Sequence, residues 1–70
     1  MTKYGKREWL RDLRLARDLT QNDVAQTLHI SKDHYQFIER GRRNPSPTLA
    51  LKIAVLFDFP MERFYEGATQ

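Results

Sequence analysis

The chain contains no cysteine, three glycines, three prolines and two histidines among its 70 residues. Without cysteine no disulfide supports this small domain, and nothing suggests export. No apolar run approaches the length of a membrane span, and residues 1–13 lack the apolar core of a secretion signal. These absences predict a cytoplasmic protein that folds as a single domain over residues 1–70, with no membrane segment.

The same scarcity argues against an enzyme. His29 and His34 are five positions apart, which places them on poorly matched helix faces for shared metal binding. The sequence also lacks a glycine-rich phosphate loop and a paired acid and base. A chain of 70 residues leaves no room for a separate effector domain. We therefore expect no catalytic residues, no metal site, no cofactor and no small-molecule ligand.

Charged residues of both signs are present but unevenly placed, with a formal net charge of +3. Residues 1–17 contain six Lys or Arg against two acids, and residues 40–43 contain three arginines. Residues 58–66 sum to −2. A basic beginning and middle with an acidic end are consistent with one face for a polyanion. Plain surface solubility is the alternative explanation, so charge alone decides little.

Apolar residues recur at helical spacing along the chain. The spacing predicts a first helix within residues 6–17 and two short helices within residues 20–41. Ser46 followed by Pro47 is a strong start signal for a fourth helix, and a short fifth helix is expected after Pro60. No alternating strand pattern is present, so the predicted fold class is all-α with five helices.

Residues 20–41 are the most informative part of the chain. Thr20, with Asp23 three positions later, is suited to cap one helix, and Ser31 is suited to cap the next. Only two residues separate these helices, which forces a sharp corner between them. Such a pair forms a helix-turn-helix, and its second helix, here residues 32–40, can enter a DNA major groove.

The second helix of this pair has two distinct faces. A step of about 100° per residue places Tyr35 and Ile38 on the inward face. On the opposite face, lysine suits guanine, and glutamine suits adenine or a phosphate. The residues that we expect to contact bases are Lys32, Asp33, Gln36 and Phe37.

Two of these residues have a second interpretation. Asp33 can accept a hydrogen bond from cytosine N4, but an acid near a helix N-terminus is also stabilised by the helix dipole. Phe37 can contact a thymine methyl group, or it can fold onto loop residues such as Pro45. The sequence leaves both alternatives open.

The segment after this helix is rich in arginine. Arg40, Arg42 and Arg43 are expected to contact phosphates, which positions a protein on DNA without reading its sequence. A solvated arginine loop is the alternative, but this loop directly follows the candidate recognition helix. Further phosphate contacts are expected from Thr20, His34, Tyr35 and Asn44.

Short motifs recur along the chain in a characteristic order. They are Leu10-x-x-Leu13-Arg14, Leu19-Thr20-Gln21, Val24-Ala25, Ile30-Ser31, Ile38-Glu39-Arg40-Gly41, Asn44-Pro45-Ser46 and Ile53-Ala54. Each motif is weak alone, but the set resembles the Cro/C1-type (XRE) helix-turn-helix regulators, which include phage repressors. The resemblance covers residues 10–65 and implies a compact, five-helix, lambda-repressor-like DNA-binding domain with its helix-turn-helix at about residues 20–40.

The resemblance also implies roles for individual residues. Gln21 is expected to contact a phosphate and to brace the recognition helix. Arg14 and Glu39 are expected to form an internal ion pair between the first and third helices. Asp18 and His29 replace glycines that are common in the family. Both residue types tolerate the left-handed backbone that these helix ends need.

The end of the chain carries more apolar residues than a small fifth helix obviously buries. We predict that some of them, within residues 57–66, form a symmetric homodimer interface. The alternative is that all of them belong to the core of the monomer. The residues concerned are Phe57, Phe59, Met61, Phe64 and Tyr65.

The sequence therefore predicts a sequence-specific transcriptional regulator that binds double-stranded DNA. We expect a repressor that binds a palindromic operator as a homodimer, because a two-fold dimer places its recognition helices in half-sites about one DNA turn apart. The alternative is a protein-interaction module, such as an antitoxin or adaptor, built on the same fold. The exposed arginines favour DNA, because a purely protein-binding module needs no phosphate contacts.

Overall fold

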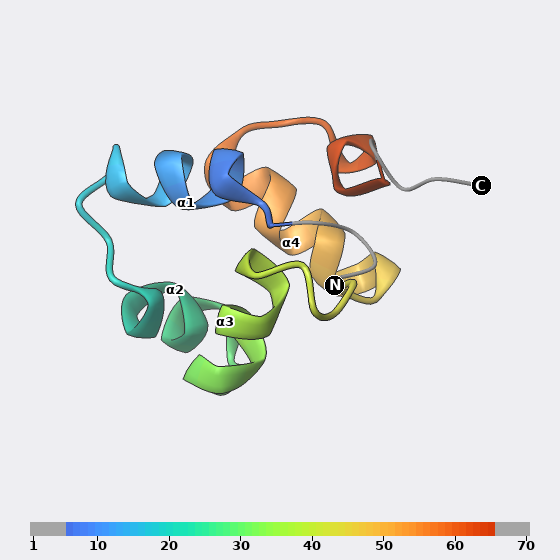
Figure 1. Ribbon diagram of the computed structural model, residues 1–70. Helices are drawn as coiled ribbons and strands as arrows, with labels where there is room; N and C mark the ends of the chain where they lie inside the picture. Colours follow the sequence, from blue (N-terminus) through green and yellow to red (C-terminus); the bar gives the residue numbers. More distant parts are fainter. Residues whose placement is uncertain (1–5, 66–70) are drawn as a thin grey trace.

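The computed structural model describes residues 6–65, which form four α-helices and one 3₁₀ helix (Figure 1). Their bounds are α1 Glu8–Leu15, α2 Gln21–Leu28, α3 Lys32–Glu39, α4 Pro47–Phe57 and η1 Met61–Tyr65. These residues contain no strand, so the all-α prediction is confirmed. The expected fifth helix has 3₁₀ rather than α geometry, and the number of α-helices is therefore four. Its five residues follow a proline and are too few for a stable α-helix.

The helices are arranged around α4. In Figure 1, α2 and α3 lie together on one side of the molecule, α1 and η1 lie on the other, and α4 runs between them. Helices α2 and α3 pack against each other, and α4 contacts both α2 and η1. Helix α1 contacts α3. This arrangement leaves one side of α3 free of other helices.

Side-chain caps begin three of the helices, as the sequence predicts. Thr20 Oγ1 accepts a hydrogen bond from the Asp23 N–H (3.0 Å), and the Asp23 carboxylate accepts one from the Thr20 N–H (2.9 Å). The second bond lowers the pKa of the Asp23 carboxyl below its ordinary value. This capping box therefore stabilises the fold at neutral pH, and its contribution is lost as acid protonates Asp23. Ser31 and Ser46 cap α3 and α4 in the same way.

Left-handed residues end the turns around these helices. Asp18 and His29 have φ angles of 56° and 61°, which confirms the backbone conformation expected where the family commonly has glycine. Asp58 has φ of 60° and ends α4 two residues before Pro60. A non-glycine residue in this region costs about 1–2 kcal/mol, so the surrounding packing must hold each turn.

The core joins all five elements. It contains eleven buried residues that are contributed by α1, α2, α3, α4 and η1. Trp9 of α1 extends it toward the chain end, because its ring makes edge-on contacts with Phe59 (5.0 Å between centroids) and Phe64 (5.6 Å). Phe59 and Phe64 also contact each other at 5.5 Å. This aromatic cluster fixes η1 against α1.

The aromatic cluster corrects the predicted dimer interface. Phe57 and Phe64 have exposed fractions of 1% and 2%, so both belong to the monomer core and neither is available to a partner. Phe59 and Met61 are partly buried against the same core, and Tyr65 remains 40% exposed. Residue 66, at the end of the predicted interface, lies outside the described residues. The prediction underestimated the core because Trp9 packs against the rings of Phe59 and Phe64.

The outer side of α4 keeps apolar side chains at the surface. Leu51 and Val55 are 55% and 73% exposed, and they border a shallow apolar groove between α4 and α2 that also includes Thr27 and Leu28. No helix within residues 6–65 is both long and apolar enough to cross a membrane.

Candidate nucleic-acid interface

Helix α3 separates its side chains between two faces as the sequence predicts. Tyr35 and Ile38 are completely buried against the core. The outer face carries the four side chains predicted to contact bases, namely the exposed Lys32 and Asp33 and the half-buried Gln36 and Phe37. All four are therefore accessible from one direction, on a helix whose other face cannot move away from the core.

The end of α3 connects this face to the arginine segment. Gly41 has φ of 75° and donates its N–H to the Ile38 carbonyl (3.2 Å), while the Arg42 N–H bonds to the Phe37 carbonyl (2.9 Å). These two bonds form a Schellman motif with Gly41 as its left-handed residue. The Arg43 N–H also reaches the Phe37 carbonyl (3.3 Å). The arginine segment is thus held at a defined position beside the helix.

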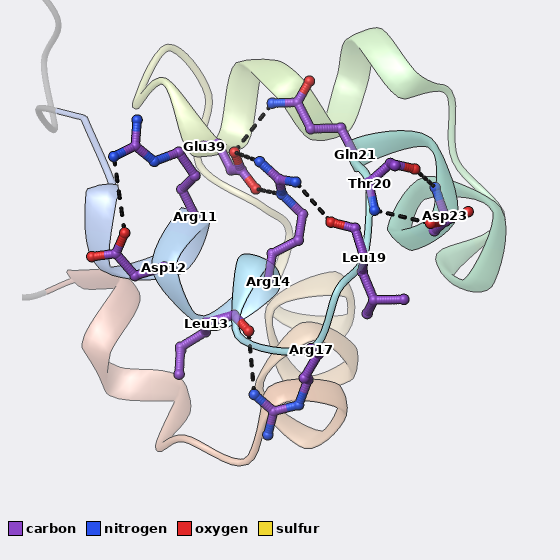
Figure 2. A network of polar contacts seen from close by, with 10 residues as sticks. All are labelled: Arg11, Asp12, Leu13, Arg14, Arg17, Leu19, Thr20, Gln21, Asp23 and Glu39. Carbon is purple, nitrogen blue, oxygen red and sulfur yellow. Dashed lines mark hydrogen bonds and ion pairs between the residues drawn. The ribbon is translucent and has the colours of Figure 1, made fainter.

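A buried ion pair joins the end of α3 to α1 (Figure 2). Arg14 Nε lies 2.7 Å from Glu39 Oε2, and Arg14 Nη2 lies 3.3 Å from Glu39 Oε1. The Arg14 Nη1 group donates to the Leu19 carbonyl in the α1–α2 connection (2.8 Å). Hydrogen bonding to Glu39 raises the pKa of the Arg14 guanidinium above its ordinary value. The ion pair implied by the family resemblance is therefore present in this structure.

Gln21 extends the network to α2. Its Nε2 group donates to Glu39 Oε1 at 3.1 Å, from the first position of α2 (Figure 2). Glu39 thus accepts hydrogen bonds from both α1 and α2 while it sits at the end of α3. The side chain of Gln21 is half-buried, so part of it remains accessible at the surface. This contact is the one expected of a residue that braces α3.

Tyr35 corrects one predicted phosphate contact. Its exposed fraction is 0%, and its hydroxyl is buried with no hydrogen-bond partner among residues 6–65. Burial, together with the nearby Glu39 carboxylate, raises the pKa of the Tyr35 phenol above its ordinary value. The hydroxyl cannot reach DNA because the ring points into the core, toward Arg14 and Glu39. The sequence could place Tyr35 inward but could not show how deeply the ring is enclosed.

Arg7 is a structural residue that the sequence analysis missed. It is 3% exposed, and its guanidinium donates to the carbonyls of Ile38 (2.5 Å) and Arg43 (3.1 Å) and to Asn44 Oδ1. Its backbone N–H donates to the Glu39 carbonyl (2.8 Å). Arg7 therefore satisfies the last carbonyls of α3, where a cation is favoured by the helix dipole, and holds the segment that follows.

No local signal distinguishes Arg7 from the other basic residues near the start of the chain. Its side-chain partners lie 31 to 37 positions away, so the contacts depend on how α1 packs against α3. The guanidinium also lies 5.2 Å from the centre of the Phe64 ring, which covers it from the side of η1. Only the assembled fold creates this enclosed site.

The other residues predicted to contact phosphates surround α3. Asn44 is half-buried. Its side-chain oxygen Oδ1 accepts a hydrogen bond from Arg7, which leaves the side-chain NH₂ group as the donor for a phosphate. His34 is half-buried at the beginning of α3. The remaining residues are exposed, and they are Thr20, Arg40, Arg42 and Arg43. Apart from Tyr35, the predicted set is accessible.

The described residues contain no group of three or more side chains that could hold a metal ion. His29 is exposed at the end of α2. His34 lies on α3, and its backbone N–H donates to Ser31 Oγ. The arrangement of this surface is one of separate polar groups rather than of converging ligands.

The pair formed by α2 and α3, with the outer face of α3 left exposed, can be compared with known proteins. The sequence matches the family model described as "Helix-turn-helix" over residues 10–64. The chain belongs to the Cro/C1-type (XRE) helix-turn-helix family. It therefore carries the DNA-binding domain of this family of transcriptional regulators, with α2 and α3 as the helix-turn-helix.

Three relatives illustrate the breadth of this family. The chain is 37% identical over 60 residues to the HTH-type transcriptional regulator YqaF of Bacillus subtilis, covering 86% of this chain and 79% of YqaF. It is 38% identical over 56 residues to the HTH-type transcriptional regulator MJ0272 of Methanocaldococcus jannaschii, covering 80% of this chain and 85% of MJ0272. It is 35% identical over 52 residues to the cryptic phage CTXphi transcriptional repressor RstR of Vibrio cholerae, covering 74% of this chain and 47% of RstR.

Proposed function

We propose that this protein is a transcriptional repressor that binds a palindromic operator in double-stranded DNA as a homodimer. The observation that carries the proposal is the outer face of α3, which is polar and accessible while its inner face is fixed by the core and by Glu39. A rigid helix with one free polar face suits insertion into a major groove. The name of the relative RstR supports the repressor role.

Base reading is assigned to four side chains on this face. Lys32 suits the O6 and N7 acceptors of guanine, and Gln36 suits adenine. Asp33 suits the N4 donor of cytosine, in addition to its favourable position at the helix N-terminus. Phe37 is the one apolar group among them and suits the methyl group of thymine.

Phosphate contacts are assigned to the residues that flank α3. Arg40, Arg42 and Arg43 supply cations on the side of its C-terminus. The backbone of this segment is held by the Schellman motif and by Arg7, so it does not need to be organised when DNA binds. The other assigned residues are Thr20, Gln21, His34 and Asn44.

Selection from random duplex DNA tests the proposal, and a palindrome should be recovered.

Lys32→Ala is expected to lower discrimination at one base position by about 1–3 kcal/mol, because a base contact is lost. Arg43→Ala should instead weaken all duplexes alike and reduce the slope of log affinity against log salt by about 1. Fluorescence anisotropy with matched and mismatched duplexes at several salt concentrations measures both effects.

Lys52→Ala is the matched control for these variants. It removes the same charge from an exposed position on α4, beside the apolar groove and away from α3. Its base preference and salt slope should equal those of the wild type. If Lys32→Ala and Lys52→Ala behave alike, Lys32 does not read a base. If no sequence is enriched, the protein-interaction alternative replaces the present proposal.

The homodimer is proposed to use the surface that remains accessible near η1, formed by Phe59, Met61 and Tyr65. Sedimentation at micromolar concentration should show a dimer, and Tyr65→Glu should shift the population toward monomer. Val55→Glu is the control, because it places the same charge on the exposed apolar side of α4. A wild-type protein that remains monomeric, both free and on a palindromic duplex, would contradict the homodimer.

The exposed side of α4 is the observation that favours the second candidate function, a protein-interaction module. Leu51 and Val55 leave an apolar surface that a partner protein could cover. This candidate predicts binding to a protein and no enrichment in the DNA selection.

A further inference from the structure

A polar groove lies between the beginning of α1 and the outer side of α3. It has a volume of about 480 Å³, and its walls include Lys6 and Arg11 on one side and Gln36, Arg40 and Arg42 on the other. The second wall belongs to the proposed DNA surface. The groove is therefore continuous with that surface and extends it toward α1, outside the helix-turn-helix itself.

The floor of the groove is already neutralised by internal contacts. Glu39 lines it, but both carboxylate oxygens accept hydrogen bonds from Arg14, and one also accepts from Gln21. Arg7 also lines the groove, and its guanidinium bonds to backbone carbonyls and to Asn44. An anion entering the groove would therefore meet a satisfied carboxylate rather than a free one.

The rim of the groove carries an excess of accessible cations. Four of its side chains are exposed Lys or Arg, against one exposed acid, Glu8. Arg11 lies 3.9 Å from Asp12, with both side chains more than half exposed, so this ion pair holds it only weakly. In Figure 2, the Arg11 side chain leaves α1 on the side of Glu39 and Gln21, whereas Arg17 points to the opposite side.

We propose that this groove binds a backbone phosphate of the DNA, held by Lys6 and Arg11, so that the contact surface extends from α3 onto the beginning of α1. The proposal rests on the DNA-binding function proposed above. Lys6 and Arg11 can approach a phosphodiester together from one wall, with the exposed Arg40 and Arg42 on the other wall, and the engaged Glu39 carboxylate does not repel it strongly. Such a contact positions the protein on the duplex and contributes no sequence preference.

Equilibrium binding to the selected duplex at 50 and 200 mM salt tests the contact. Arg11→Gln should bind more weakly than wild type, and its deficit should be about 3.5-fold larger at 50 mM than at 200 mM salt, as expected for the loss of one phosphate contact. Lys6→Gln should behave in the same way. Lys52→Gln is the control, because it makes the same charge change on α4 and should show neither effect.

A duplex with single methylphosphonate linkages identifies the phosphate. Neutralising one linkage should weaken wild-type binding more than it weakens binding of Arg11→Gln, in which Lys6 alone still meets that phosphate, whereas every other linkage should affect both proteins alike. Inorganic phosphate provides the remaining comparison, in an NMR titration at constant ionic strength. If it saturates the groove while Arg11→Gln binds the duplex like wild type, the site takes a free anion and the proposed DNA contact is wrong.

The outcomes separate this proposal from the proposed function. If wild type binds the duplex but Arg11→Gln and Lys52→Gln lose equal affinity, only the groove contact is wrong. If wild type binds no duplex above its affinity for random DNA, the sequence-specific function itself is wrong. A thermal melt of each variant shows that the substituted proteins remain folded.

Discussion

Glu39→Gln is expected to lower the free energy of unfolding by about 3–5 kcal/mol, the largest effect of any single substitution considered for this domain. The substitution leaves the Arg14 guanidinium buried without its carboxylate, and it weakens the bond from Gln21. Domains of this kind have total stabilities of about 5–15 kcal/mol, so the loss is a large fraction. Chemical denaturation followed by circular dichroism measures it.

A second variant keeps this prediction testable if Glu39→Gln does not fold. Arg14→Met combined with Glu39→Leu removes both charges, and apolar groups of similar size often replace a buried ion pair with little loss. We expect the double variant to be more stable than Glu39→Gln. A denaturation midpoint of Glu39→Gln equal to that of wild type would show that the ion pair does not contribute this stability.

Arg7→Met is expected to lower the free energy of unfolding by about 3 kcal/mol. The substitution removes charge-assisted hydrogen bonds to the buried Ile38 carbonyl, which keeps only the bond from the Gly41 N–H, and to the partly buried Arg43 carbonyl. The N–H groups of Arg42 and Arg43 bond to the Phe37 carbonyl in α3. Their amide exchange should also become faster, because Arg7 no longer holds this segment in place. Denaturation and hydrogen-exchange NMR measure the two effects.

Arg11→Met is the matched control for stability. Arg11 lies four positions later, on the exposed side of α1, and surface substitutions of this kind usually change stability by less than about 0.5 kcal/mol. Arg7→Lys adds a second comparison, because lysine keeps the charge but lacks the planar fork that reaches several acceptors. If Arg7→Met and Arg11→Met are equally stable, the contacts made by Arg7 contribute little.

The local signals of the sequence were sufficient for the helix-turn-helix. A cap depends on a side chain and an N–H three residues away, so Thr20 and Ser31 could be recognised from their positions alone. The face of α3 follows from helical periodicity, which is why Lys32 and Asp33 are exposed as predicted. The ion pair between Arg14 and Glu39 was available only through the family resemblance, since its partners are 25 positions apart.

The errors of prediction share one cause. Phe57 and Phe64 were assigned to a dimer interface because their apolar character is visible in the sequence. The groups that help to enclose them, the guanidinium of Arg17 over Phe57 and the ring of Trp9 against Phe64, lie far away along the chain. Tyr35 was given a phosphate contact because the depth of its burial depends on neighbouring helices. Arg7 was overlooked for the same reason, as it resembles any exposed arginine until α1 meets α3.

The sequence by itself determined where the helices begin, which face of α3 is polar and which family the chain resembles. These properties depend on neighbours within about four positions along the chain, or on short motifs in order. The tertiary structure alone decided which apolar groups remain exposed and which cations are bound internally. Arg7 and Arg11 show the difference, because the two side chains are chemically identical and only the packing of α1 on α3 buries one of them and leaves the other exposed.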